Sequence, residues 1–235
     1  LGYYPSPDRR DGRFRNVDVR VTRPGLTVRA RKGYVAPAAK PRPAPKNTLD
    51  SRIPAPIREA LASPLPARDV PVTLFAAAYA GVRPKASVAL VLEIDGSRLP
   101  FTEKDGMFHE ELEIHTLAMD ASGKIQSGGR DTAPLHLRPA SRDAVVRHGL
   151  RVTRRLDLPP GRYQILVAVR ENNGGAIGTI RQDLDVPQFD RGGLQMSGIA
   201  LSASSSSQAP TANPDPGLKD VLPGPATARR EFSRE

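Results

Sequence analysis

Apolar residues recur at every second position through most of the chain between Val70 and Val186. Successive side chains of a β-strand point to opposite faces, so this period gives each strand one apolar face and one polar face. Turn residues such as Asp95-Gly96 and Asn172-Asn173-Gly174-Gly175 interrupt the pattern at regular intervals. About seven such strands, with almost no helical periodicity, predict an all-β fold: an antiparallel β-sandwich of the immunoglobulin or fibronectin type III kind.

Two short helical segments are predicted, one within the strand pattern and one in the linker that precedes it. Residues 139–148 predict one or two helical turns closed by Gly149, because glycine is favoured just after a helix end. Residues 56–62 predict a short helix with proline in its first turn and Pro64 as its stop. The strand between the predicted turns around residues 123 and 139 is expected to cover residues 133–137.

A turn made by Pro160 and Gly161 feeds a strand that opens with Tyr163. This is the position of the tyrosine corner in immunoglobulin-like sandwiches, where the phenol hydroxyl bonds back across the loop. We expect Tyr163, Pro160 and Gly161 to form such a corner, because a buried phenol needs a hydrogen-bond partner. The alternative is an ordinary core tyrosine.

The segments on either side of the sandwich differ from it in composition. Hydrophobic residues, glycine not counted, make up 38% of the chain, against roughly 45–50% with glycine counted in a typical domain, which predicts a packed core diluted by linkers. Proline density indicates extended chain before the sandwich, and a Ser-, Pro- and Ala-rich stretch indicates disorder after it. The expected segments are a linker with a short helix at 38–68, the sandwich at 69–190, a possible extra strand at 191–201 and a disordered tail at 202–226.

Positive charge is concentrated in the N-terminal flank. Residues 1–46 hold 12 Lys and Arg against three Asp, while the whole chain has a net charge of +10. Within this flank, residues 12–34 predict a β-hairpin around Arg23-Pro24-Gly25. An Arg-rich solvated face is the preferred interpretation. The alternative is contact with a polyanion or nucleic acid through Arg13, Arg15, Arg29, Arg31 and Lys32. We do not expect nucleic acid, because residues 9–32 hold only one aromatic side chain, Phe14, for base stacking.

Candidates for catalysis are few. The chain has no cysteine, which removes thiolate chemistry and Cys-based zinc sites. His109, Glu111, Glu113 and His115 share one face of a predicted strand, so a metal-dependent hydrolase is a further alternative. The two histidines, however, lie about 20 Å apart along a strand. We expect a solvated polar face there, isolated histidines at 136 and 148, and no enzyme activity, metal or cofactor.

Four segments of the N-terminal flank resemble the closing part of VWFA-related domains of the acidobacterial type, which are exported proteins with a von Willebrand factor type A domain. The segments are Leu1-Gly2-Tyr3-Tyr4-Pro5, Asp11-Gly12-Arg13-Phe14-Arg15, Val19-Arg20-Val21 and Arg29-Ala30-Arg31-Lys32-Gly33-Tyr34. The resemblance implies that residues 1–37 are the last strands of an α/β domain. In this family a β-sandwich follows that domain, and residues 156–187 are similar to part of it. It also implies that residues 227–235 open a further β-module.

The same resemblance implies an extracytoplasmic location and a role in adhesion or protein–protein contact, with an unidentified protein as partner. The metal-binding signature of the family, Asp-x-Ser-x-Ser, belongs upstream of these segments, so no metal ligand is carried over. We therefore expect a fragment of a longer chain, and no membrane span within it, since no apolar run approaches about 20 residues.

Overall fold

The computed structural model describes residues 13–17, 33–35, 49, 52–189, 195–202, 208–222 and 224–228. The chain divides into two units, residues 1–48 and residues 49–235. In the first unit, β1 (Phe14–Asn16) pairs antiparallel with β2 (Gly33–Val35), and Phe14 lies opposite Val35. Antiparallel pairing is what the predicted hairpin requires. Its turn and most of its predicted alternating residues, at positions 18–32, lie outside the described residues.

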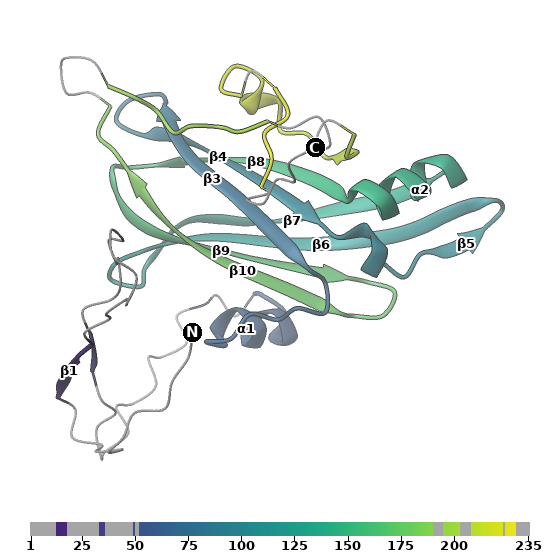
Figure 1. Cartoon of the computed structure of the whole chain (residues 1–235), viewed down its shortest axis with the longest axis horizontal. Coiled ribbons are helices and arrows are strands. Elements are labelled where there is room, and N and C mark those ends of the chain that lie inside the picture. The colour runs from purple at the N-terminus through teal and green to yellow at the C-terminus, as the bar shows by residue number, and fades with distance from the viewer. Residues whose placement is uncertain are drawn as a thin grey trace, which may run out of the picture. The chain divides into compact units, whose positions relative to one another are not determined.

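The second unit contains two sheets that face each other (Figure 1). The four-stranded sheet has the order β11-β8-β4-β3 and consists of β3 (Val72–Ala80), β4 (Ala86–Ile94), β8 (Leu150–Leu158) and β11 (Thr211–Ala212). The five-stranded sheet consists of β5 (Thr102–Lys104), β6 (Met107–Asp120), β7 (Ile125–Leu137), β9 (Gly161–Glu171) and β10 (Ile177–Val186). Strand β6 is its centre and pairs with β9, β7 and β5.

Apolar side chains from the two sheets fill the space between them. Leu90 and Leu92 of β4 and Leu112 and Ile114 of β6 are at most 1% exposed. They occupy alternate positions on their strands, so each strand turns its apolar face inward, as the period of two requires. The predicted all-β sandwich is therefore confirmed, and its pattern arises from burying one face of each strand.

A helix covers the outer face of the five-stranded sheet. Helix α1 (Ala55–Ala62) lies where the sequence predicts a short helix. Its side chains Ile57 and Leu61 are fully buried against Leu117 and Leu166 on that face. We expected this stretch to be part of a linker, but its apolar positions one turn apart make it a part of the packed unit.

A second helix and one turn of 3-10 helix lie between the strands, and a second 3-10 turn follows the last strand. Helix α2 (Pro139–His148) ends at Gly149, whose φ of 80° is a conformation that glycine adopts readily, as the sequence predicts. The 3-10 turns are η1 (Gly96–Arg98) and η2 (Pro216–Leu218). Neither α-helix of the described chain is long and apolar enough to cross a bilayer.

Strand β7 is longer than the sequence predicts. It begins at Ile125 rather than at Ala133 and includes the glycines at 128 and 129. A side chain at Gly128 would lie 2.6 Å from the Thr116 carbonyl oxygen, and one at Gly129 would lie 2.4 Å from the Arg154 guanidinium. Glycine here therefore permits close approach of neighbouring groups within a strand, and it does not form a loop.

The predicted disorder of residues 202–226 is wrong for the part that the structure describes. We call residues 208–222 and 224–228 the C-terminal cover. This segment lies along the four-stranded sheet, where β11 pairs parallel with β8. Asp215 fixes this segment, because its carboxylate accepts hydrogen bonds from the backbone amides of Arg155 (2.8 Å) and Gly217 (2.9 Å). Thr227 donates a hydrogen bond to Glu93 at 3.0 Å. These hydrogen bonds order the segment, and amino-acid composition alone does not predict them.

The predicted extra strand at 191–201 is also wrong for its described part. Residues 195–202, here called the edge segment, form no strand of their own. The amide of Gly198 donates one hydrogen bond of 2.9 Å to the Ala78 carbonyl oxygen on β3. Leu194 lies outside the described residues. The apolar side chains of Met196, Ile199 and Leu201 are exposed to solvent and are not part of the core.

Candidate functional site

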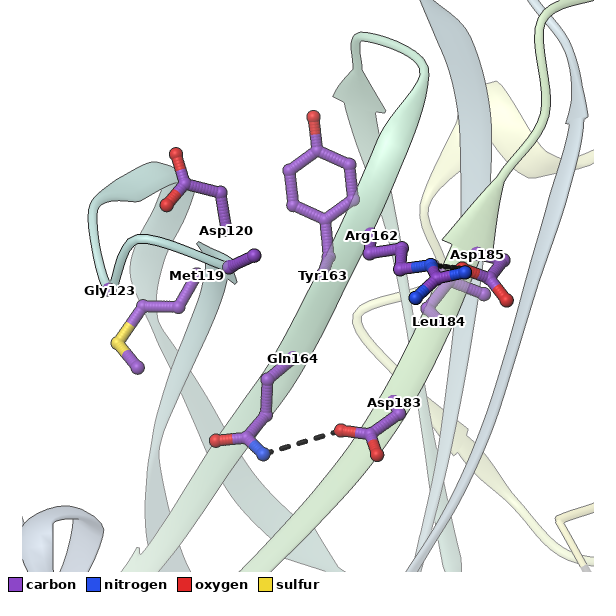
Figure 2. Close-up of a pocket in the computed structure, with 10 residues that line it drawn as sticks. Met119, Asp120, Gly123, Arg162, Tyr163, Gln164, Asp183, Leu184 and Asp185 are labelled. Atoms are coloured by element: carbon purple, nitrogen blue, oxygen red, sulfur yellow. Dashed lines mark hydrogen bonds and ion pairs between the residues drawn. The ribbon is translucent and has the colours of Figure 1, made fainter.

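A polar hollow of the sandwich lies where β6 turns into β7, beside the start of β9 and the end of β10 (Figure 2). It has a volume of about 730 Å³ and is open to solvent. Charged and amide side chains dominate its lining. They include Asp120, Arg162, Gln164, Asp183 and Asp185, together with Tyr163.

Asp120 holds the turn at one side of this hollow. One carboxylate oxygen accepts hydrogen bonds from the Ser122 hydroxyl (2.6 Å) and amide (2.8 Å) and from the Lys124 amide (3.1 Å). The other accepts a bond of 2.6 Å from the Gln126 side chain. These bonds, those from the Ser122 and Gln126 side chains first, lower the pKa of Asp120 to about 2. A carboxylate this weakly basic is a poor proton acceptor near neutral pH. The role of Asp120 is therefore to stabilise the turn between β6 and β7 through these hydrogen bonds.

Tyr163 is one of the residues that line the hollow, and it lies at the position predicted for a tyrosine corner. Its hydroxyl donates a hydrogen bond of 2.9 Å to the Pro159 carbonyl oxygen, across the turn that contains Pro160 and Gly161. Burial, with a smaller contribution from the charge of Asp120, raises the pKa of Tyr163. The phenol therefore stays protonated and acts as a hydrogen-bond donor to its own loop.

The remaining charges of the hollow pair across β9 and β10. Arg162 Nε lies 3.4 Å from an Asp185 oxygen, and the Gln164 amide donates a 3.3 Å bond to Asp183. Figure 2 shows these two pairs side by side on the sheet face, with the Tyr163 ring separate from them. Both pairs are strongly solvated, so they contribute little binding energy. The hollow has charge of both signs but no convergence of its groups on one point.

Two buried carboxylates hold the opposite end of the sandwich. Glu171 is 1% exposed, and its two oxygens accept hydrogen bonds from the amides of Gly174 (2.7 Å) and Ala176 (2.5 Å). Glu110 accepts bonds from the amides of Asn172 (3.0 Å) and Glu111 (2.8 Å). Together these acids fix the Asn-Asn-Gly-Gly turn between β9 and β10. Sequence reasoning missed this role, because it considered only the exposed or buried face of each strand.

Glu110 has an unusual environment for an acid. Its second oxygen is buried and has no hydrogen-bond partner among the described residues. Burial raises its pKa most strongly, and the charge of Glu171 adds to this, while the backbone bonds oppose it. A carboxyl group with one unpartnered oxygen in the interior favours its protonated form. The bonds of Glu110 and Glu171 to the backbone of this turn give the pair the character of a structural cap.

The predicted His/Glu strand does not form one site. His115 and Glu113 are 4% and 5% exposed, so the expected solvated face is wrong at these two positions. The His115 Nε2 lies 2.8 Å from a Glu113 oxygen, and Arg130 Nε lies 2.8 Å from the same oxygen. The more exposed Arg130 from β7 pairs with this acid on the outer face. The buried group is a satisfied ion pair within the sheet.

The other predicted histidine pairs across strands instead. His109 on β6 lies opposite His136 on β7, and their Nδ1 atoms are 2.8 Å apart. Their rings meet edge to face, with centroids 4.9 Å apart. We expected His136 to be isolated, which is wrong, because the pairing of β6 with β7 places it opposite His109. An alignment of β6 against the full β7 would have placed the two residues opposite each other.

Of the basic residues proposed for polyanion contact, the structure describes only two. Arg13 is exposed and Arg15 is half-buried, next to and within β1. Arg29, Arg31 and Lys32 lie outside the described residues. Polyanion binding by this flank therefore stays a prediction.

The fold defines an antiparallel β-sandwich module. The sequence matches no family model and no curated protein. Solved structures similar to part of it include a glycosyl hydrolase family 2 member from Bacteroides cellulosilyticus DSM 14838, with 12% identity and a TM-score of 0.36 over 50% of this chain. A β-glucuronidase of glycoside hydrolase family 2 has 11% identity and a TM-score of 0.32 over 49%. A proposed β-galactosidase from Bacteroides fragilis has 14% identity and a TM-score of 0.32 over 49%.

This chain covers only 15%, 11% and 16% of those three proteins, respectively. A likeness at this level says nothing about activity.

Proposed function

We propose that this chain is a non-catalytic interaction and structural module of an exported multi-domain protein. The observation that carries the proposal is a group of exposed apolar side chains on the edge segment. Met196, Ile199 and Leu201 are 78%, 68% and 53% exposed, within six residues of one another. Single exposed apolar residues are ordinary, but several together favour contact with another protein surface. We propose a protein partner with a complementary apolar surface.

Backbone bonds hold the edge segment in this orientation. The Gly198 amide donates to Ala78, and the Leu201 carbonyl oxygen accepts a 2.8 Å bond from the Thr227 amide. Ser202 forms an antiparallel bridge with Ala226. These bonds anchor the segment at Gly198 and at its C-terminal end, while the side chains of Met196, Ile199 and Leu201 stay exposed to solvent. Such pre-ordering reduces the entropy lost when a partner binds.

The ionisable groups of the sandwich support a non-catalytic role. Asp120, Glu171 and Asp215 each accept hydrogen bonds from backbone amides of the turns around them. One oxygen of Glu113 lies 2.8 Å from both His115 Nε2 and Arg130 Nε. These groups are held in structural bonds, whereas catalysis requires an acid or base that is free to exchange a proton with a substrate.

The location outside the cytoplasm is part of the proposal and is supported by the resemblance of residues 1–37 to VWFA-related domains. The reading frame upstream of Leu1 tests it. We expect an export signal and an Asp-x-Ser-x-Ser loop that follows an apolar strand. An upstream frame with neither feature would remove both the family and the location from the proposal.

Photo-crosslinking tests the proposed contact. A photoreactive amino acid replaces Ile199 in the full-length protein in its native cells, and a second variant carries it at Glu103, an exposed residue of β5. We expect crosslinks to one protein species from position 199, several times the yield from position 103, and their loss in Met196→Ser/Leu201→Ser. Equal yields at both positions, or yields that the serine substitutions leave unchanged, would contradict the proposal.

A further inference from the structure

The side chains of His109 and His136 form a cross-strand pair that could bind a metal. The pair takes no part in the hydrogen bonds of the turns described above or in the edge segment. The two Nδ1 atoms approach to 2.8 Å on the outer face of the five-stranded sheet, and the contact is exposed to solvent. Adjacent antiparallel strands fix their separation, because the two residues are directly opposite in the register. Two exposed imidazoles at a fixed separation are a chelating pair for a transition metal.

The separation selects the geometry of the ion. For metal–nitrogen bonds of about 2.0–2.1 Å, two nitrogens 2.8 Å apart subtend an angle of about 86° at the metal. Tetrahedral coordination needs about 109°, which would require the nitrogens to be about 3.3 Å apart. Square-planar or tetragonal coordination needs about 90° between neighbouring ligands, which Cu²⁺ prefers. Once the proton between the two rings has left and the rings have turned both Nδ1 lone pairs towards one ion, a nitrogen spacing near 2.8 Å fits Cu²⁺ better than Zn²⁺.

Proton placement at the pair is compatible with binding. At 2.8 Å, one ring donates its Nδ1 proton to the other ring. When a metal binds, that proton moves to the Nε2 of the same ring, so both Nδ1 lone pairs become ligands without a change in net charge on the imidazoles. The exposed carboxylate of Glu111 lies on the same face, about 7 Å along the strand, and adds negative charge nearby.

We infer that His109 and His136 form a surface site for Cu²⁺, with water completing the coordination. The part of the chain that the structure describes contains no group of three or more His, Cys, Asp or Glu side chains arranged for a metal. Two protein ligands with open positions make an exchangeable site of modest affinity, one that a donor group from another molecule can complete. This inference is independent of the proposed protein contact, which uses the edge segment.

Electron paramagnetic resonance with Cu²⁺ as the probe tests the site on the full 235-residue chain. We expect one equivalent of bound Cu²⁺ with hyperfine splitting from two imidazole nitrogens. His109→Ala and His136→Ala are each expected to weaken binding by at least about tenfold, because each leaves a single protein ligand and removes the chelate effect. The matched control is His148→Ala at the end of α2, which should bind Cu²⁺ as the unmodified protein does.

A second measurement avoids dependence on variants. Paramagnetic broadening of the histidine ring signals by sub-stoichiometric Cu²⁺ should affect His109 and His136 first and leave His115 and His148 sharp. Broadening that begins at His115 or His148, or a His109→Ala/His136→Ala double variant that binds Cu²⁺ as tightly as the unmodified protein, would overturn the inference. Tighter retention of Zn²⁺ than Cu²⁺ would also contradict the assigned geometry.

Discussion

The Tyr163 hydroxyl donates a hydrogen bond to the Pro159 carbonyl oxygen at 2.9 Å, whereas the buried hydroxyl of Tyr79 has no partner among the described residues. The two phenols thus offer a matched pair. One hydroxyl closes the turn between β8 and β9, and the other costs free energy because it is desolvated without a bond.

Tyr163→Phe is expected to lower the free energy of unfolding by about 1 kcal/mol, because the bond to Pro159 is lost. Tyr79→Phe removes a hydroxyl that has no partner in the described chain, so it should be neutral or stabilising. Urea denaturation of both variants measures the difference. Equal destabilisation by the two substitutions would contradict the assignment of a tyrosine corner.

Glu110→Gln should become more stabilising, relative to the unmodified protein, as the pH rises. The pKa of Glu110 is raised in the folded state from its ordinary value of 4.5. Its contribution to stability is therefore fully present below pH 4.5 and is lost as the pH rises through the raised pKa. Glutamine does not titrate, so urea midpoints of the two proteins should diverge from acid towards neutral pH. Glu103→Gln, at an exposed position, is the control; a pH-independent difference for Glu110→Gln would oppose the interpretation.

Asp120→Asn should have the opposite pH dependence. The pKa of Asp120 is lowered from 3.8 to about 2, so its ionised form stabilises the fold fully above pH 3.8 and less as the pH falls through 2. The variant is expected to be less stable than the unmodified protein at neutral pH and equally stable below pH 2. Carboxyl NMR titration checks the premise directly. An Asp120 that titrates near 3.8 in the folded protein would refute it.

Ile57→Ala tests whether α1 belongs to the packed unit. Ile57 is fully buried against the outer face of the five-stranded sheet, so its truncation should lower the unfolding free energy by about 2–4 kcal/mol. Leu65→Ala, at a residue that is 75% exposed, is the control and should stay within about 0.5 kcal/mol. If both substitutions were neutral in a denaturation experiment, α1 would be part of a loose linker after all.

Gly198→Ala should detach the edge segment from β3. A Cβ at this position would lie 2.5 Å from the Ala77 Cβ, so the edge segment and β3 would have to move apart. Gly224→Ala is the control, because its added Cβ meets nothing within 4 Å. Hydrogen exchange of the residue 198 amide should accelerate in the first variant and not in the second. Unchanged protection in Gly198→Ala would show that the bond to Ala78 survives.

The period of two was sufficient to predict the sandwich, because burial of one strand face dictates where Leu90 or Leu112 can be placed. Pro56 and Gly149 likewise predicted the positions of α1 and α2 through local backbone preferences. The turn at Pro160 and Gly161 predicted the bond that Tyr163 makes. These are local signals, and they do not depend on knowing which strands are neighbours.

Features that depend on strand register could not be predicted in the same way. The pairing of His109 with His136 requires the full length of β7, and the burial of His115 beside Glu113 requires the neighbouring Arg130. The C-terminal cover resembles a disordered tail in composition, but Asp215 and Thr227 supply its order through single hydrogen bonds. The resemblance to VWFA-related domains and the polyanion contact remain predictions.

The C-terminal cover also has a practical consequence for how the protein can be divided. Strand β11 pairs with the outer side of β8, so a polypeptide ending before residue 208 would leave that row of amides and carbonyls open. Open rows of this kind recruit strands from other chains. Shortened versions of the protein are therefore expected to aggregate through β8, even though every strand of the sandwich core is intact.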